Sequence, residues 1–263
     1  MRFVPFGVPR FEDLGLPEVI GRLAREERAI ILVAGTTGSG TSTTLASMLD
    51  LVNRTGSKHI VTIEDPIEFL HRDKSIINQR EVGQDTASYS RVLRRVLRQD
   101  PDIILAGEIR NSESAQIGFS AAETGHLVLS TLHSLDATER INRMIDLFPP
   151  HERSQVRAML AGPLRGIVGQ RLLRTKDGAG RAAACEVLVA TERLKGFILD
   201  PKQTDQIHTA ISKGEYYGMQ TFDQALVKPI EQDRVSYEEA LKVASRPQDF
   251  RLMVQSLGLG MPR

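Results

Sequence analysis

The chain has 263 residues, of which 41% are hydrophobic and 25% charged, the mixture of a folded globular protein rather than a disordered one. Its 34 lysines and arginines nearly balance 33 aspartates and glutamates, so a net charge of +1 offers no excess of cations to nucleic-acid phosphates. The longest apolar runs, such as residues 29–34, are far shorter than the roughly 20 residues that cross a bilayer. Cys185 is the single cysteine, which excludes an internal disulfide and a multi-thiolate zinc site and favours a reducing compartment. We therefore expect a cytoplasmic protein with no transmembrane segment and no nucleic-acid partner.

The first half of the chain alternates strand and helix patterns. Four short, continuous apolar runs with β-branched residues are typical of strands buried on both faces of a parallel sheet: residues 29–34, 59–64, 102–106 and 127–132. Between them, apolar residues recur at helical spacing after Gly40 and across residues 88–99. Alternating strands and helices predict βαβ units and an α/β core.

The second half shows a different pattern. Helical periodicity is expected from residues 151 to 173, interrupted at Pro163, because proline kinks or restarts a helix. Glycines within residues 176–180 mark a turn before the apolar run 182–189, which predicts a hairpin. Farther on, the chain is expected to form a small helical bundle, and Ser236 begins a capping-box pattern within it.

A glycine-rich segment at residues 35–42 follows the first expected strand and opens a helix. In this context successive backbone N–H groups can surround an anion, and the helix dipole attracts negative charge. The Ser42 hydroxyl would be placed on Mg²⁺. Thr41 stands where the phosphate-loop pattern requires lysine, so a hydroxyl donor replaces a full positive charge. The predicted phosphate-contacting residues are Gly35, Thr36, Thr37, Gly38, Ser39, Gly40, Thr41, Ser42 and Thr43.

Four segments downstream of this loop resemble, in their order and their spacing, the motifs of a known family: residues 62–69, 78–81, 97–110 and 121–133. They resemble the signature boxes of the type II/type IV secretion ATPases, and the similarity extends over about residues 12–250. The resemblance implies a RecA-like P-loop core with a mainly parallel sheet, ATP and Mg²⁺ as cofactors, and a homo-hexamer. A single cysteine excludes the four-cysteine insert of many secretion and extension members, which favours the PilT-type pilus-retraction branch.

Three regions are expected along the chain. Family members carry a further N-terminal domain related to PAS folds, and residues 1–15 are interpreted as a linker or a remnant of it. Residues 16–190 are predicted to form the RecA-like ATPase core. Residues 191–263 are predicted to form a C-terminal helical region.

The resemblance also implies roles for three glutamates. Glu68 is the candidate for orienting and activating water, just past the carboxyl end of a strand, where α/β proteins bind ligands. Glu64 is a possible auxiliary residue that holds the same loop, with a solvated or structural role equally open. Glu108 stands at the end of an expected strand, where a Walker B acid reaches Mg²⁺ directly or through water. Gly107 occupies the position of the usual aspartate, as in the resembled family.

Histidine and arginine candidates complete the predicted site. His126 and His133 flank an expected strand, and a separation of seven places them on opposite strand faces. The resemblance favours His133 as the sensor of the γ-phosphate and leaves His126 as a possible auxiliary. Arg80 and the arginines of residues 88–99 could complete a neighbouring subunit's site, although a solvated helix face is the favoured interpretation of that row.

Three functions are compatible with these motifs. The leading one is a motor that retracts a type IV pilus from the cytoplasmic face of the inner membrane, acting on a membrane-embedded platform protein. Residues 192–197 depart from the family's retraction signature, and Thr41 departs from the phosphate loop. The alternatives are a non-hydrolysing assembly subunit beside an active paralogue, and a secretion or DNA-uptake motor of the same family.

Overall fold

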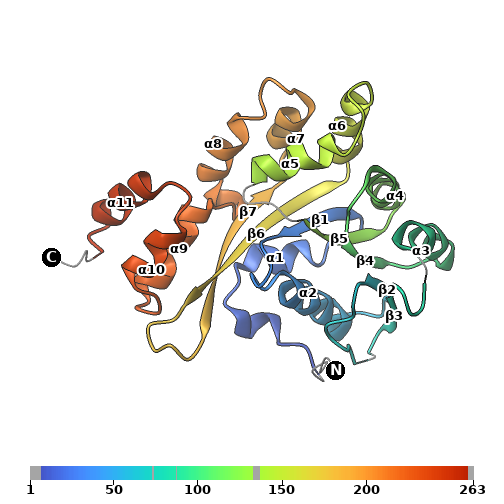
Figure 1. Ribbon diagram of the computed structural model, residues 1–263, viewed down its shortest axis with the longest axis horizontal. Helices are drawn as coiled ribbons and strands as arrows, with labels where there is room; N and C mark the ends of the chain where they lie inside the picture. The colour runs from blue at the N-terminus through green and yellow to red at the C-terminus, as the bar shows by residue number, and fades with distance from the viewer. Residues whose placement is uncertain (1–6, 73, 87, 133–136, 260–263) are drawn as a thin grey trace.

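The computed structural model describes residues 7–72, 74–86, 88–132 and 137–259, which form a sheet covered by helices on both faces (Figure 1). The strand order in the sheet is β3-β2-β4-β5-β1-β6-β7. Neighbouring strands are parallel except for the antiparallel pair β6 and β7. The strands are β1 (Ala29–Ala34), β2 (His59–Glu64), β3 (Ile76–Glu81), β4 (Ile103–Glu108), β5 (Leu127–Leu132), β6 (Leu164–Arg174) and β7 (Arg181–Val189). The predicted α/β fold with a mainly parallel sheet is confirmed.

Two helical layers explain why β1, inside the sheet, is apolar along its whole length. All six residues of β1 are buried. Its alternate side chains enter two separate cores, so neither face can be polar. The helices on one side are α1 (Glu18–Leu23) and α2 (Thr41–Thr55); on the other are α3 (Tyr89–Val96), α4 (Ser112–Glu123), α5 (Ala137–Asp146) and α6 (Arg153–Ala161).

The expected helical segment 151–173 is correct only for its first part. The helix α6 ends at Ala161, and residues 164–174 form β6 between β1 and β7. Leu164, Ile167 and Val168 are fully buried, and their spacing of three and four imitates a helix. A register shift where β6 pairs with the start of β1 interrupts the alternation of buried residues that would have distinguished a strand from a helix. Pairing with β1 and β7 therefore outweighed the local pattern.

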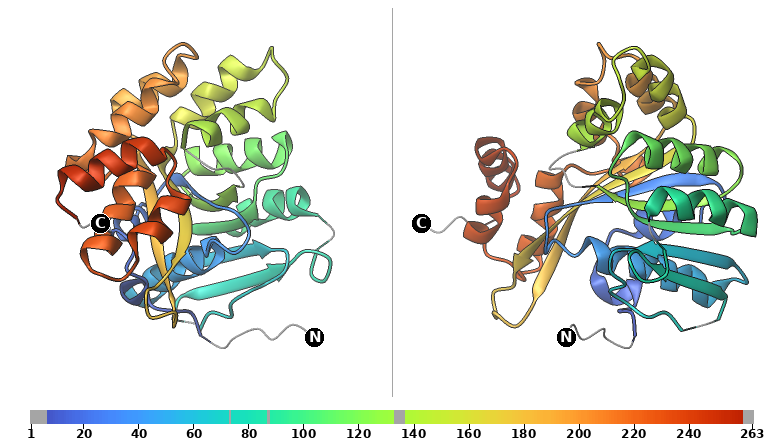
Figure 2. Two further views of the ribbon diagram at one scale, coloured as in Figure 1. Left: turned by 60° about the vertical axis from the view of Figure 1, so that its left-hand side comes forward. Right: turned by 45° about the vertical axis from the view of Figure 1, so that its right-hand side comes forward.

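The hairpin predicted around residues 176–180 is confirmed, since β6 and β7 pair antiparallel from Gly166↔Val189 to Arg174↔Arg181. Helices α7 (Glu192–Leu199) and α8 (Gln206–Ser212) follow, then α9 (Phe222–Glu231), α10 (Tyr237–Val243) and α11 (Pro247–Ser256). Three short 3₁₀ turns are η1 (Phe11–Leu14), η2 (Leu97–Gln99) and η3 (Glu215–Tyr217). The last three α-helices pack against the outer part of the hairpin through a core of their own (Figure 2).

Helix caps follow the local sequence. The Ser236 side chain accepts a hydrogen bond from the Glu239 amide at 3.2 Å, so α10 begins where the predicted capping pattern places it. Among the described residues, no helix combines the length and apolar character that a membrane span requires.

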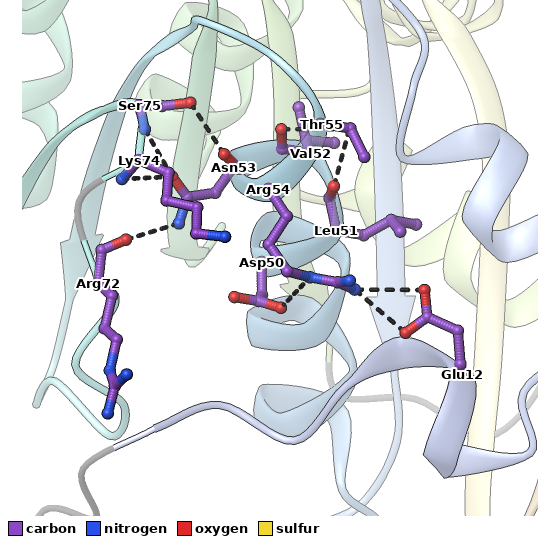
Figure 3. A network of polar contacts seen from close by, with 10 residues as sticks. All are labelled: Glu12, Asp50, Leu51, Val52, Asn53, Arg54, Thr55, Arg72, Lys74 and Ser75. Carbon is purple, nitrogen blue, oxygen red and sulfur yellow. Dashed lines mark hydrogen bonds and ion pairs between the residues drawn. The ribbon is translucent and has the colours of Figure 1, made fainter.

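Helix α2 holds elements on either side of it through polar contacts near its carboxyl end (Figure 3). Arg54 is 2.8 Å from Asp50 in the same helix and 3.1 Å from Glu12 in η1. Asn53 accepts a hydrogen bond from the Ser75 amide at 2.8 Å and donates one to the Arg72 carbonyl at 2.8 Å. One helix therefore begins at the phosphate loop and anchors the connection between β2 and β3.

Candidate functional site

The glycine-rich loop joins β1 to α2. Gly38 and Gly40 adopt left-handed backbone conformations with φ of 83° and 85°, which side chains larger than hydrogen disfavour. A cavity of about 610 Å³ opens beside the loop, and Thr36, Thr41 and Ser42 are among the residues that line it. The loop and the first turn of α2 thus form one wall of a concave site.

The carboxylates predicted from sequence line the same cavity. Glu64 ends β2, Glu68 lies in the following connection, and Glu108 ends β4. Because β1, β2 and β4 run parallel, their carboxyl ends meet at the edge of the sheet that carries the loop. The structure therefore brings three carboxylates and the phosphate loop together around one space.

Glu64 is largely withdrawn from solvent, and burial raises the pKa of its carboxyl group. Its Oε1 accepts hydrogen bonds from Thr62 Oγ1 at 2.7 Å and Gln79 Nε2 at 3.3 Å. Gln79 also donates to the Phe69 carbonyl at 2.9 Å and accepts from the His71 amide at 3.1 Å. These bonds tie the connection that carries Glu68 to β3, an edge strand that the sequence analysis missed because it has few apolar residues.

Glu108 is paired with Arg110, whose Nε lies 2.6 Å from its Oε1. The preceding residue is glycine, and a Cβ there would lie 2.4 Å from the Tyr89 hydroxyl and 3.0 Å from the Ile63 carbonyl oxygen. That hydroxyl donates a hydrogen bond of 3.0 Å to the Ile63 carbonyl, so it is held in place. A side chain at position 107 would therefore crowd Tyr89 and the end of β2, and Glu108 is the carboxylate of β4 that lines the cavity.

Gln170 supports the phosphate loop from β6, which continues past the end of β1. Its buried side chain accepts a hydrogen bond from Thr44 Oγ1 at 2.6 Å and donates one to the Ser39 carbonyl at 2.9 Å. A Cβ on Gly40 would approach its amide nitrogen to 2.8 Å. Gln170 thus supports the loop from below, next to Gly40, although no local motif marks it.

Replacing Gln170 with leucine is expected to lower the free energy of unfolding by about 1–3 kcal/mol, because a buried carbonyl and a hydroxyl lose their partner. Nucleotide affinity should fall as well, since the loop loses its support. Urea unfolding and calorimetric titration with ATP measure both effects. Gln232→Leu, at an exposed position after α9, is the matched control, and equal effects of the two changes would contradict this role.

The predicted histidines and Arg80 are not among the described residues that line the cavity. His126 precedes β5 at the opposite edge of the sheet, where its carbonyl accepts from the Ala29 amide and its Nδ1 is 2.9 Å from the Ala121 carbonyl. His126 does not line the cavity beside the phosphate loop in this chain, and its possible auxiliary role stays a prediction. His133 lies outside the described residues. Arg80 contacts Gln99 at 3.4 Å and does not line the cavity.

The predicted arginine row is exposed at all four positions, of which Arg91, Arg94 and Arg95 lie in α3 and Arg98 lies in η2. Arg94 forms an ion pair with Glu113 on α4 and remains 64% exposed. Cys185 is buried, and burial raises the pKa of its thiol to about 12, so it is not a thiolate nucleophile. No group of three or more histidine, cysteine, aspartate or glutamate side chains within the described part of the chain could hold a metal ion.

Further side chains line the cavity without having been predicted, among them His71, Tyr89 and Arg181. Arg181 begins β7, and its guanidinium lies 3.5 Å from the Gly38 carbonyl. It is far from the loop in sequence, so only the pairing of β7 with β6 brings it there. Burial lowers the pKa of the His71 imidazole, which favours its neutral form.

Comparison with known proteins reveals extensive similarity. The family model described as type II/IV secretion system protein matches residues 13–253. The chain is 45% identical over 250 residues to the type IV pilus retraction ATPase PilT of Pseudomonas aeruginosa, covering 95% of this chain and 72% of that protein. It is 43% identical to a twitching motility protein of Neisseria gonorrhoeae, covering 95% and 67%.

Solved structures agree with these sequence relatives. The crystal structure of the pilus retraction motor PilT with bound ADP matches with a TM-score of 0.87 and 42% identity, over 96% of this chain and 71% of that one. The ATPase DotB of Legionella pneumophila matches with a TM-score of 0.81 and 25% identity, over 97% and 68%.

Proposed function

The chain belongs to the type II/IV secretion system protein family, and from this premise we propose that it is an ATP-binding motor subunit that hydrolyses ATP to drive type IV pilus retraction. The observation that carries the proposal is the convergence of the phosphate loop with Glu68 and Glu108 on one cavity. The relatives named for pilus retraction and twitching motility support the cellular role.

In this proposal the loop residues 35–43 hold the phosphates through backbone N–H groups and hydroxyls. Ser42 and Glu108 would hold Mg²⁺, and their hard oxygen atoms line the same cavity, a donor set that fits this ion. When bound, Mg²⁺ neutralises charge on the phosphates. Glu68 orients the attacking water and accepts its proton, and Glu64 holds the connection that carries Glu68. His133 remains the proposed sensor of the γ-phosphate.

The proposed assembly is a homo-hexamer at the cytoplasmic face of the inner membrane, acting on a pilus platform protein. The exposed arginines of α3 and Arg80 are candidates for contacts with a neighbouring subunit. Residues 1–15, 16–190 and 191–263 remain the proposed division into linker, ATPase core and C-terminal helical region.

A second candidate function is favoured by Thr41, which leaves the loop without the lysine of the phosphate-binding pattern. The chain would then be a non-hydrolysing nucleotide-binding subunit that works beside an active paralogue. Both functions use the same cavity, and they differ in whether phosphate is released.

Replacing Thr41 with lysine separates the two candidates. A hydrogen bond to a charged group contributes about 1.5–3 kcal/mol, so ATP affinity is expected to rise about 10- to 100-fold. The motor proposal expects phosphate release already from the Thr41 protein, whereas the non-hydrolysing subunit expects release only from the lysine variant. Steady-state phosphate release and calorimetric ATP titration give both quantities.

The possible outcomes distinguish the motor, the non-hydrolysing subunit and a protein that binds no nucleotide. Equal turnover by the two proteins would contradict the non-hydrolysing candidate. ATP binding without turnover by the Thr41 protein would contradict the motor. Failure of both proteins to bind ATP would contradict a nucleotide function at this cavity.

A further inference from the structure

The charges around the cavity are unbalanced for a site that binds a polyanion. Four carboxylates line it: Glu64, Asp65, Glu68 and Glu108. Among the described lining residues, Arg181 is the only lysine or arginine. Arg110 lies beside the cavity, but its guanidinium is engaged by Glu108 at 2.6 Å and Asp65 at 3.6 Å. Neutral His71 adds little positive charge, because burial lowers its pKa.

The hairpin holds Arg181 at the rim of the phosphate loop. Arg181 pairs with Arg174 as the first register pair after the turn. The turn itself is closed by Thr175, whose hydroxyl donates to the Gly180 carbonyl at 3.0 Å, and the Lys176 amide donates to the Arg234 carbonyl at 2.9 Å. The start of β7 therefore has a defined place relative to the loop.

The contact between Arg181 and the loop is directional. Its Nη1 donates to the carbonyl of Gly38, which lies at the left-handed turn of the loop. A guanidinium has five N–H donors in a planar fork, and this contact uses one of them. The fork suits the oxygen atoms of a phosphate, with which arginine forms bidentate hydrogen bonds.

We propose that Arg181 contacts the phosphates of the bound nucleotide and provides the positive charge that the loop lacks at Thr41. The proposal rests on the nucleotide function proposed above. It explains how an otherwise acidic cavity can attract a multiply charged anion: a cation from the β6–β7 hairpin stands in for one from the loop. It also makes that hairpin a wall of the nucleotide site.

The test combines Arg181→Gln with the presence or absence of lysine at position 41. In the Thr41 protein, Arg181→Gln is expected to weaken binding of ATP with Mg²⁺ by about 10- to 100-fold, the effect of losing a charged hydrogen-bond partner. In the Thr41→Lys protein, Arg181→Gln should weaken ATP binding by a much smaller factor, since the lysine already provides a positive charge. Arg181→Lys, which keeps the charge, should retain part of the affinity.

Arg174→Gln is the matched control, because Arg174 is the exposed cross-strand neighbour of Arg181 and does not line this cavity. It is expected to leave ATP affinity unchanged in both backgrounds. Urea midpoints of all variants establish that the fold is retained. Calorimetric titration with Mg²⁺ and a non-hydrolysable ATP analogue is the readout, so the result does not depend on hydrolysis.

The outcomes separate this proposal from the function on which it rests. If ATP binds but Arg181→Gln and Arg174→Gln have equal effects, Arg181 does not contact the phosphates, while the nucleotide function stands. If Arg181→Gln lowers ATP affinity by the same factor with threonine and with lysine at position 41, Arg181 does not replace the charge of the missing lysine. Absence of ATP binding by every version would overturn the nucleotide function itself.

Discussion

Replacing Glu68 with glutamine is expected to reduce ATP turnover about 10²- to 10⁴-fold, the usual contribution of general base catalysis, while ATP affinity stays nearly unchanged. Glutamine keeps the size and the hydrogen-bonding reach of glutamate but cannot accept the proton of the attacking water. Glu68 lines the cavity, so the change acts at the proposed site of chemistry rather than on the loop.

Steady-state phosphate release and calorimetric ATP titration measure the two quantities separately. Both substitutions are made in the protein that releases phosphate, whether it carries threonine or lysine at position 41. Glu64→Gln is the matched control: Glu64 ends β2, four residues before Glu68, and its Oε1 accepts hydrogen bonds from Thr62 and Gln79. A larger loss from Glu64→Gln than from Glu68→Gln would reverse the two roles, and full turnover by Glu68→Gln would exclude it as the base.

The largest stability effect is expected at Arg140 on α5. Its guanidinium lies 3.1 Å from the Glu186 carboxylate on β7, and the two side chains are only 2% and 4% exposed. Glu186 also accepts a hydrogen bond from the Ala137 amide at 2.8 Å, which holds the start of α5 against the sheet. Arg140→Met should lower the free energy of unfolding by about 3–5 kcal/mol, because it leaves a buried carboxylate without its countercharge.

Urea unfolding of four proteins checks this expectation. Adding Glu186→Gln to Arg140→Met should recover part of the loss, because the buried charge is removed while an acceptor for the Ala137 amide remains. Arg94→Met is the control, since it breaks a solvent-exposed ion pair with Glu113 and should cost at most about 1 kcal/mol. If Arg140→Met and Arg94→Met destabilise equally, the buried pair contributes no more than a surface pair.

The central strands were predictable because burial on both faces leaves a clear sequence pattern. Residues 29–34, 59–64 and 127–132 coincide with β1, β2 and β5, and the pattern at 102–106 identifies β4. Prediction was wrong for residues 164–173, whose apolar spacing imitates a helix, and it omitted β3, an edge strand with polar residues. In both places pairing with neighbouring strands, rather than local hydrophobic periodicity, determines the structure.

The amino-acid sequence was enough to predict those parts of the candidate site whose chemistry is local. A phosphate loop needs glycines and a helix start within eight residues, and Glu68 and Glu108 follow strands that end at the same edge. The residues that surround them depend on how distant segments of the chain pack together. Gln170 under the loop and Arg181 at its rim come from a hairpin more than a hundred residues away, as the hydrogen bonds to Ser39 and Gly38 show. No sequence motif encodes such contacts, because β6 and β7 reach the loop only through their order in the sheet.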